Sequence, residues 1–406
     1  MSDATQTIRQ YSDGFLLKKS KKLQGSIKSW AERNSVWQDC GFKSWVEHYD
    51  SPPDPGIPCA FLLCLDGGFS QLVEGDESWG LFKEFQALVD ASGFWWDRMD
   101  SSTLVFMAND EELSKAYGAL AEWDWTSSLI APDFALIHES IFEYFHKSGG
   151  ASLHKLSPRD FEVYLDSLFQ GRGYRTILGP GSNDGGVDLR LYSSEITGDV
   201  LTLVQAKRYA PSRPIHLDAV QALTAAVDYE PADRGLFVTT SRFLPSAKNF
   251  TTRKANHVTL LAGQDVLALS ELAAKEVAEK RGELVKLTRI KALMESSSPG
   301  KFDGQILHAN MGYGISDNEF AICVKSSAGA ALLCPIPKKI SSHDGYEQAG
   351  FHIPDVSVSA LAKLNRTNMF LAKITHSKVG TSPYLWGNRE LYRVWDGKPC
   401  SFNICD

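Results

Sequence analysis

Residues 183–209 read NDGGVDLRLYSSEITGDVLTLVQAKRY, and this stretch decides the fold of the middle of the chain. Asp188 follows a double glycine, a strand-like segment comes next, and Gln205 and Lys207 stand two positions apart near its end. A spacing of two places residues on the same face of a strand. We therefore expect a carboxylate, an amide and an ammonium to converge where this strand ends.

The segment 200–207 is apolar on both faces. Period-two alternation puts Leu201 and Leu203 on the face that Gln205 and Lys207 complete, while the opposite face is also largely apolar. Coverage of both faces is typical of a central strand. Because burial of an unpaired ammonium is strongly disfavoured, the polar end of this strand predicts a cleft.

Composition sets the broad class. The chain has 406 residues, enough for two or three domains, and its 43% hydrophobic and 22% charged content excludes wholesale disorder. No apolar run approaches the roughly 20 residues of a membrane span, and the N-terminus has no secretory signal pattern. Seven scattered cysteines indicate reduced thiols rather than a disulfide framework. We expect a cytoplasmic protein with no membrane partner.

Net charge and the Gly-, Pro- and Ser-rich segments divide the chain into four parts. Residues 1–150 carry a net charge of −11 and eight of the ten tryptophans, which predicts an acidic, Trp-rich N-terminal α+β domain. Residues 151–270 carry +1 and form the domain that contains the polar strand. Residues 271–300 read as a helical linker, and 301–406 as a small β-rich domain. The acidity is therefore confined to the first part, which makes it a poor polyanion binder.

The second domain has a readable order of elements. Ser157, Pro158 and Asp160 fit the N-cap, the first helical position and a capping box. The expected elements are, in order, a helix over 157–169, strands over 174–178, 187–192 and 200–207, a helix over 217–229, a strand over 235–240, a helix over 245–255 and a strand over 258–261. This order predicts an α/β fold whose mixed central sheet is flanked by helices.

Four sequence blocks in this domain resemble those of a known family. SPRDFE at 157–162, GSNDGGVDL at 181–189, VQAKRY at 204–209 and GLFVTTSRFLPSA at 235–247 occur in the order found in the Mrr-type restriction endonuclease catalytic domain. That family is a branch of the PD-(D/E)xK nuclease superfamily, and the resemblance covers residues 153–270. It implies a restriction-endonuclease-like core and a divalent-metal-dependent phosphodiesterase that acts on double-stranded DNA.

The resemblance also implies roles for individual residues. Asp188 would be the metal-binding aspartate, Gln205 a variant of the usual second carboxylate and also a metal ligand, and Lys207 the catalytic lysine. Mg²⁺ or Mn²⁺ held by oxygen ligands can activate water and stabilise charge on the phosphate. Because glutamine brings no charge, metal affinity depends on Glu162, the acidic residue of the first helix. Glu162 is either part of the metal site or a solvated carboxylate.

Three further residues are weaker candidates for DNA contact. Arg190 and Arg208 could hold backbone phosphates, or they could form ordinary surface ion pairs. Gln221, on the following helix, could face the cleft or be an exposed polar residue.

The last third of the chain leaves two questions open. Residues 264–295 show apolar residues at helical spacings, which could pair two protomers into a homodimer or pack on their own domain. In the β-rich domain, Tyr384, Trp386 and Trp395 could stack on a base in a target-recognition or sensing module, or they could be core residues.

The sequence predicts a DNA endonuclease that restricts foreign or modified DNA. One alternative is a catalytically weak DNA-binding or assembly subunit that retains a nuclease fold. Another alternative is a structure-specific DNA repair nuclease. Retention of Asp188, Gln205 and Lys207 together favours an active enzyme.

Overall fold

The computed structural model divides into two compact units, Met1–Ser128 and Leu129–Asp406. The residues that it describes are 11–74, 79–130, 139–181, 186–195, 198–298, 301–311, 316–327, 329–346, 348–375 and 383–404. The first unit ends before residue 150, the boundary that we expected. Helix α6 (Ser140–Ser148) packs on helix α11 (Gly263–Leu284), and this contact places it in the second unit.

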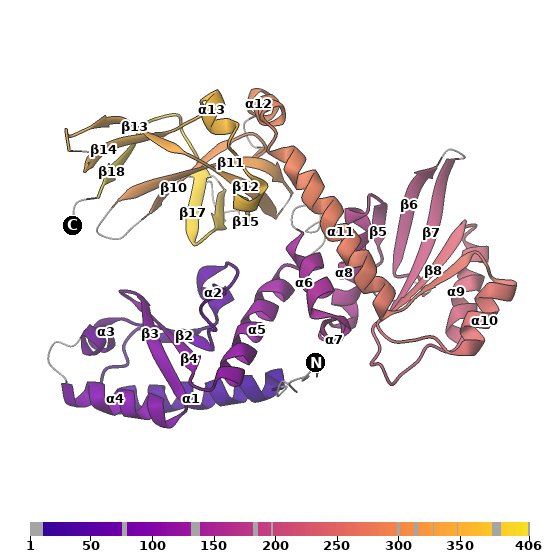
Figure 1. Ribbon diagram of the computed structural model, residues 1–406, viewed down its shortest axis with the longest axis horizontal. Helices are drawn as coiled ribbons and strands as arrows, with labels where there is room; N and C mark the ends of the chain where they lie inside the picture. The colour runs from indigo at the N-terminus through magenta and orange to yellow at the C-terminus, as the bar shows by residue number, and fades with distance from the viewer. Residues whose placement is uncertain are drawn as a thin grey trace, which may run out of the picture. The chain divides into compact units, whose positions relative to one another are not determined.

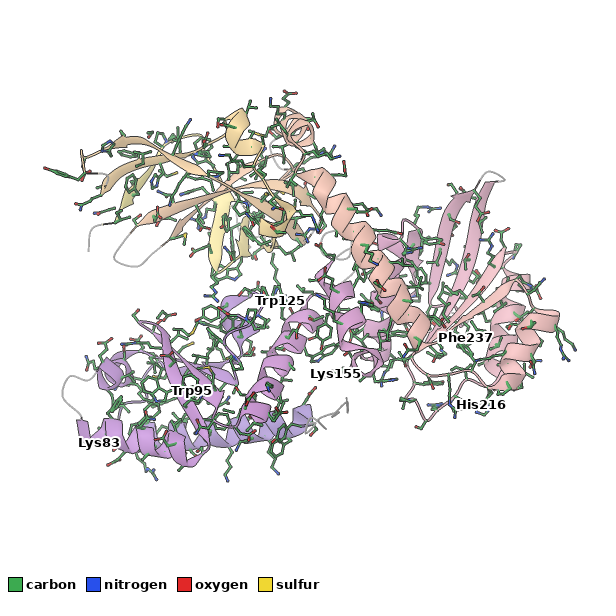
Figure 2. All side chains as sticks on the ribbon, viewed as in Figure 1. Lys83, Trp95, Trp125, Lys155, His216 and Phe237 are labelled. Atoms are coloured by element: carbon green, nitrogen blue, oxygen red, sulfur yellow. The ribbon has the colours of Figure 1, made fainter. Side chains whose placement is uncertain are left out.

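The first unit is an antiparallel sheet packed with helices. Its strands β1 (Gly41–Lys43), β2 (Phe61–Cys64), β3 (Phe94–Asp100) and β4 (Thr103–Ala108) lie in the order β1-β2-β4-β3. The helices are α1 (Asp13–Arg33), α2 (Trp45–Tyr49), α3 (Gly67–Glu74), α4 (Trp79–Ala91) and α5 (Glu111–Ser128). Trp30 and Trp45 are buried, whereas Trp95 is 42% exposed, so the tryptophans are divided between core and surface (Figure 2).

The second unit begins with the mixed sheet that the sequence predicts. Its elements up to the sheet's end are α6, α7 (Gly150–Leu153), α8 (Pro158–Gly171), β5 (Arg175–Leu178), β6 (Leu189–Glu195), β7 (Gly198–Lys207), α9 (Leu217–Tyr229), β8 (Arg234–Thr239), α10 (Pro245–Lys254) and β9 (Val258–Leu261). The strand order is β5-β6-β7-β8-β9 (Figure 1). Strands β5, β6 and β7 pair antiparallel, and β7, β8 and β9 pair parallel. The mixed α/β class is therefore confirmed.

Helices cover both faces of this sheet. Helices α9 and α10 lie against one face, and α8 and α11 lie against the other (Figure 1). Leu203 of β7 belongs to the core under α9, together with Leu223 of α9 and Phe237 of β8. Phe237 is labelled in Figure 2. Strand β7 is thus a central strand covered on both sides, as its apolar pattern predicts.

The rest of the second unit is rich in β structure. It contains α12 (Leu287–Ser296), β10 (Ile306–Met311), β11 (Asp317–Ser326), β12 (Ala330–Ile336), β13 (Lys338–His343), β14 (Ala349–Pro354), α13 (Val358–Leu361), the 3₁₀ helix η2 (Arg366–Asn368), β15 (Phe370–Thr375), β16 (Tyr384–Gly387), β17 (Glu390–Val394) and β18 (Cys400–Asn403). Among the described residues, β10, β11, β12, β15, β16 and β17 close a barrel, and β13, β14 and β18 form a separate sheet.

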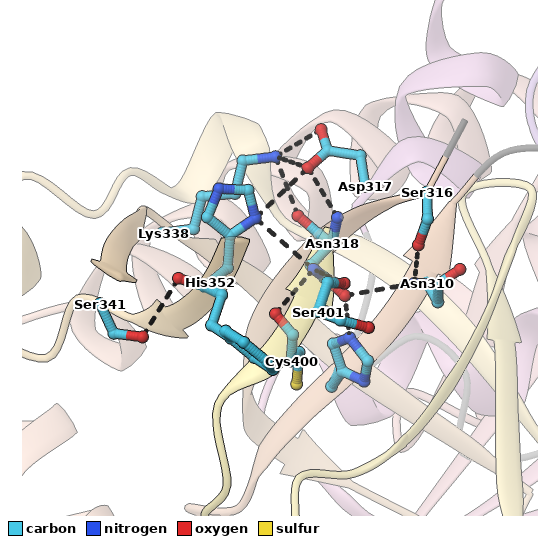
Figure 3. A network of polar contacts seen from close by, with 11 residues as sticks. Asn310, Ser316, Asp317, Asn318, Lys338, Ser341, His352, Cys400 and Ser401 are labelled. Atoms are coloured by element: carbon cyan, nitrogen blue, oxygen red, sulfur yellow. Dashed lines mark hydrogen bonds and ion pairs between the residues drawn. The ribbon is translucent and has the colours of Figure 1, made fainter. Parts of the chain in front are cut away.

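A buried polar network joins the barrel to the small sheet (Figure 3). The fully buried Asn318 of β11 donates from its amide to the carbonyl oxygens of Cys400 and Ser401 on β18, at 3.3 and 2.8 Å. Next to it, the ammonium of Lys338 on β13 pairs with the carboxylate of Asp317 at 2.5 Å. Because a buried amide without partners would cost about 1–3 kcal/mol, these bonds fix the small sheet on the barrel.

The aromatic residues considered for base stacking are half-buried. The indole of Trp395 donates to the carbonyl oxygen of Lys398 at 2.7 Å and lies edge-on to Phe320. Tyr384 and Trp386 lie on β16 with their side chains partly exposed. A stacking role for these side chains stays a prediction.

Helix α11, which covers most of the first half of the expected linker 271–300, is part of the second unit. Its buried residues include Val266, Ala273 and Val277, and they pack toward α6 and α8. This packing is the alternative to a dimer interface that the sequence left open, and dimerisation through 264–295 stays a prediction. Within the described part of the chain, no helix is long and apolar enough to cross a membrane.

A buried ion cluster connects α6, α11 and the barrel. Glu139, at the N-cap of α6, pairs with Arg281 of α11 and with Arg366 of η2. The side chains of Arg281 and Glu139 are 5% and 11% exposed, and Arg281 also donates to the carbonyl oxygen of Arg366 at 3.3 Å. The cluster therefore holds the buried guanidinium of Arg281 and the exposed guanidinium of Arg366 around one buried carboxylate.

We predict that Glu139→Ala destabilises the second unit by about 3–5 kcal/mol, because it leaves a buried guanidinium without its counter-charge. The measurement is urea unfolding of the full chain, followed by far-UV circular dichroism. Glu143→Ala on the same helix is the control. The Glu143 carboxylate is 45% exposed and pairs with Lys147 one turn away, so its loss should cost about 0.3–0.5 kcal/mol. Equal losses for the two variants would contradict a structural role for the cluster.

Candidate active site

The polar residues Gln205 and Lys207 lie at the carboxyl end of β7, the central strand of the sheet. Gln205 and Lys207 share the face of β7 that also carries Leu203. Gln205 is 8% exposed, and its Oε1 atom is buried with no hydrogen-bond partner among the described residues. A buried carbonyl oxygen without a donor is costly unless something outside the protein binds it. This oxygen is therefore available to a ligand.

Asp188 lies directly beside Gln205. Its main-chain N–H donates to the carbonyl oxygen of Val204 at 2.8 Å, and its Oδ2 accepts from the N–H of Ala206 at 2.6 Å. Asp188 is therefore hydrogen-bonded to Val204 and Ala206, the two residues on either side of Gln205. Asp188 is only 5% exposed, so the main-chain donor compensates part of the cost of burying a carboxylate.

A glycine-rich loop borders this pair, and residues 182–185 of it lie outside the described part. Gly186 has a positive φ of 85°, and a Cβ atom there would lie 3.1 Å from Nε2 of Gln205. At the other end, a Cβ on Gly181 would lie 3.0 Å from a guanidinium nitrogen of Arg159. Glycine at 186 therefore allows both the left-handed turn and the close approach of the Gln205 amide.

Glu162 occupies the second turn of α8, the helix that packs on β5, β6 and β7. The residue is 9% exposed, and its carboxylate pairs with the guanidinium of Arg159 at 2.7 Å. Glu162 is therefore not a solvated carboxylate, which was one of the two alternatives. Its role at a metal stays a prediction, and Arg159 competes for the same oxygen atoms.

The oxygen atoms at this site suit a hard divalent cation. The Asp188 carboxylate and the orphaned Oε1 of Gln205 are the ligand types that Mg²⁺ and Mn²⁺ accept. In the part of the chain that the structure describes, no three His, Cys, Asp or Glu side chains form a metal-binding group. Mg²⁺ often uses only one or two carboxylates together with water and substrate phosphates, so this donor set fits a substrate-assisted site.

The weaker DNA-contact candidates differ in their surroundings. Arg190 forms a two-pronged ion pair with Glu230, at 2.8 Å between Nη2 and Oε2, which is the alternative role that we considered for it. Arg208 follows Lys207 and is half-buried, with its Nε buried and unbonded among the described residues. Gln221 is an exposed residue on α9.

No sequence motif marks His154 as a site residue. This residue follows α7 and contacts the main chain of Tyr209 and the charge of Arg208, just beyond Lys207. Burial, assisted by the Arg208 charge, lowers the pKa of its imidazole, while the bond to Tyr209 opposes the shift. We therefore expect a neutral imidazole at pH 7. No motif marks this position because the contact joins residues more than fifty positions apart.

The domain with this mixed sheet, with Asp188 next to Gln205 and Lys207 on the same strand, also matches a family of known proteins. Residues 153–270 match the family model Mrr_cat, which is described as a restriction endonuclease, so this segment is an Mrr-type restriction endonuclease domain. The uncharacterized protein y4cE of Sinorhizobium fredii (strain NBRC 101917 / NGR234) is 32% identical over 107 residues. That match covers 26% of this chain and 27% of the relative, about a quarter of its length.

Similar solved structures include two restriction endonucleases. The MspJI restriction endonuclease, solved with a 27-mer oligonucleotide, is 23% identical, with 36% of each chain covered and a TM-score of 0.24. The DNA modification-dependent restriction endonuclease AspBHI is 18% identical, with 46% of this chain and 58% of that chain covered and a TM-score of 0.27.

We predict that Gly186→Ala abolishes the rise in melting temperature produced by Mg²⁺, because the added methyl group displaces the Gln205 amide. Gly198→Ala is the matched control. Gly198 also has a positive φ, of 126°, but a Cβ there would meet nothing within 4 Å. Both variants should lose about 1–2 kcal/mol of unfolding free energy from backbone strain. Differential scanning fluorimetry with and without Mg²⁺ separates them, and an unchanged response in Gly186→Ala would contradict this account.

Proposed function

We propose that this chain is a metal-dependent endonuclease that hydrolyses phosphodiester bonds in double-stranded DNA. The single observation that carries the proposal is the placement of Asp188, bonded to the main chain on both sides of Gln205, next to a buried Gln205 Oε1 that has no partner among the described residues. The Mrr-type domain at 153–270 supports the reaction class. Restriction of foreign or modified DNA is the biological role that suits this class, with the β-rich residues 301–404 as the target-recognition module.

Each site residue has a distinct task in this proposal. Asp188 and Gln205 would hold Mg²⁺ or Mn²⁺, and a bound cation would make a water molecule nucleophilic and stabilise charge on the phosphate. The Lys207 ammonium, on the same face as Gln205, orients the attacking water and offsets charge on the phosphate. Two contacts fix the positions of the carboxylates. Arg159 forms an ion pair with Glu162, and the main-chain N–H of Ala206 donates to Asp188.

The charge at the site limits its affinity for metal. Asp188 supplies one negative charge, Gln205 supplies none, and Glu162 is neutralised by Arg159. A DNA phosphate brings the missing negative charge, so we expect metal and DNA to bind cooperatively. By thermodynamic linkage, metal must strengthen DNA binding by the same factor by which DNA strengthens metal binding.

We predict that Lys207→Ala lowers the rate of Mg²⁺-dependent plasmid cleavage about 10²–10⁴-fold, the usual contribution of a positioned proton-transfer group. Lys147→Ala, on the exposed face of α6, changes the charge equally and should leave the rate unaffected. The assay follows conversion of supercoiled plasmid to nicked and linear forms. Cleavage that survives Lys207→Ala would refute the site assignment.

The same assay separates the alternatives. DNA binding without cleavage in Mg²⁺ and in Mn²⁺ would favour an assembly subunit that retains the nuclease fold. Preference for branched over linear duplex of equal length would favour a repair nuclease. Digestion of modified but not unmodified DNA would support a modification-dependent restriction role.

We predict that Gln205→Glu lowers the Mg²⁺ concentration for half-maximal cleavage about tenfold, which corresponds to about 1.4 kcal/mol of added attraction. Without metal, the new carboxylate repels Asp188, so the melting temperature should fall and then rise more steeply as Mg²⁺ is added. The fluorimetric titration therefore gives a readout that does not depend on turnover. An unchanged Mg²⁺ requirement together with an unchanged thermal response would show that residue 205 does not bind the metal.

A further inference from the structure

The segment from Lys207 to Ile215 is a cationic loop that leaves the active-site strand. It runs from the end of β7 toward α9, and its basic residues are Lys207, Arg208 and Arg213. Arg242 follows the end of β8 next to it, because the N–H of Ile215 donates to the carbonyl oxygen of Arg242 at 2.8 Å. Two segments that are distant in sequence thus bring four cations to one edge of the sheet.

Three hydroxyl side chains hold this loop in place. Thr239 Oγ1 donates to the carbonyl oxygen of Lys207 at 2.8 Å. Thr240 Oγ1 accepts from the N–H of Tyr209 at 3.0 Å and donates to its carbonyl oxygen at 2.7 Å. Ser241 Oγ donates to the carbonyl oxygen of Pro211 at 3.4 Å. The Thr-Thr-Ser run at the end of β8 therefore fixes the cationic loop against the sheet.

Apolar packing anchors the far end of the loop. Ile215 and Phe243 form a parallel bridge, and both are at most 5% exposed. The guanidinium of Arg213 lies 4.0 Å from the ring centroid of Tyr209, which limits its freedom. A rigid main chain and a stacked arginine lose little entropy when they bind an anion.

The charges at this edge are not neutralised by neighbouring carboxylates. Among the described residues, Lys207, Arg208, Arg213 and Arg242 form no ion pair. The acidic residues on helices that begin at this edge are Asp218 and Asp265, both in first helical turns, and Asp265 accepts from the N–H of Ala262. Three other arginines of the domain are in ion pairs: Arg172 with Glu276, Arg190 with Glu230 and Arg234 with Glu195.

We propose that Arg213 and Arg242 bind the DNA phosphates that flank the scissile bond and so hold the duplex against Lys207. This inference rests on the proposed nuclease function and adds the surface that positions its substrate. Both side chains are exposed, while the main chain that carries them is fixed. Contacts of this kind position DNA without reading its sequence. The surface is therefore a non-specific backbone contact, and sequence or modification is read elsewhere.

The test measures binding in the absence of turnover. Fluorescence anisotropy of an end-labelled 30-base-pair duplex is recorded with EDTA at several NaCl concentrations. Each lost phosphate contact reduces the slope of log affinity against log salt by about 0.9, so Arg213→Ala/Arg242→Ala should reduce it by about 2. Affinity should fall at least about tenfold at low salt and equally for duplexes of unrelated sequence.

Arg172→Ala/Arg234→Ala removes the same net charge from arginines that are already paired, and its slope should match that of the wild type. Equal slopes for the two double variants would overturn the proposal, because the effect would then be one of net charge. A wild-type slope in Arg213→Ala/Arg242→Ala would overturn it as well. Far-UV circular dichroism and urea unfolding check that each variant is folded, above all the control, because the side chain of Arg172 is only 26% exposed.

Failure of the phosphate surface and failure of the nuclease proposal give different results. Duplex binding that depends on Arg213 and Arg242, in a wild type that never cleaves, supports the phosphate surface and refutes the endonuclease. Cleavage by the wild type, with unchanged binding in the double variant, supports the endonuclease and refutes this surface.

Discussion

The hydrogen bonds on the two sides of β7 are the constraint on which the active site depends. The strand pairs antiparallel with β6 on one side and parallel with β8 on the other, so its main-chain groups are used within the sheet. Such a strand cannot rotate or slip without losing a whole ladder of bonds. The side chains of Gln205 and Lys207 therefore project from fixed positions on the sheet. The hydrogen bond from the N–H of Ala206 to the carboxylate of Asp188 fixes Asp188 beside them.

A different constraint governs the helical side of the second unit. Glu139, Arg281 and Arg366 come from α6, α11 and η2, and the two buried charges, Glu139 and Arg281, are stable there only when they are paired. Hydrophobic packing between α6 and α11 would tolerate small shifts, whereas a charge cluster requires its partners at hydrogen-bond distance. The cluster therefore specifies how the barrel joins the helix that covers the nuclease sheet.

The sequence predicts the features that depend on local periodicity. The mixed sheet and the shared face of Gln205 and Lys207 follow from alternation and from the order of elements. Features that depend on contacts between distant residues could not be read in this way. The ion pair of Glu162 with Arg159 was missed even though the two are one helical turn apart, because either partner could have pointed elsewhere. The contact of His154 with Tyr209, and the assignment of α6 to the second unit, require the folded chain.

Glutamine at position 205 is consistent with the burial of the site. Asp188 and Gln205 are both less than a tenth exposed, and two adjacent carboxylates in such a place would repel each other whenever no cation is bound. A neutral amide avoids that repulsion and still offers an oxygen ligand, but it weakens the attraction for a metal. Arg159 adds to this effect by neutralising Glu162. The site therefore favours stability without metal over tight metal binding. In the proposed nuclease, the phosphate of the DNA would supply the charge that the protein lacks, so the full set of charges would assemble only when DNA is bound.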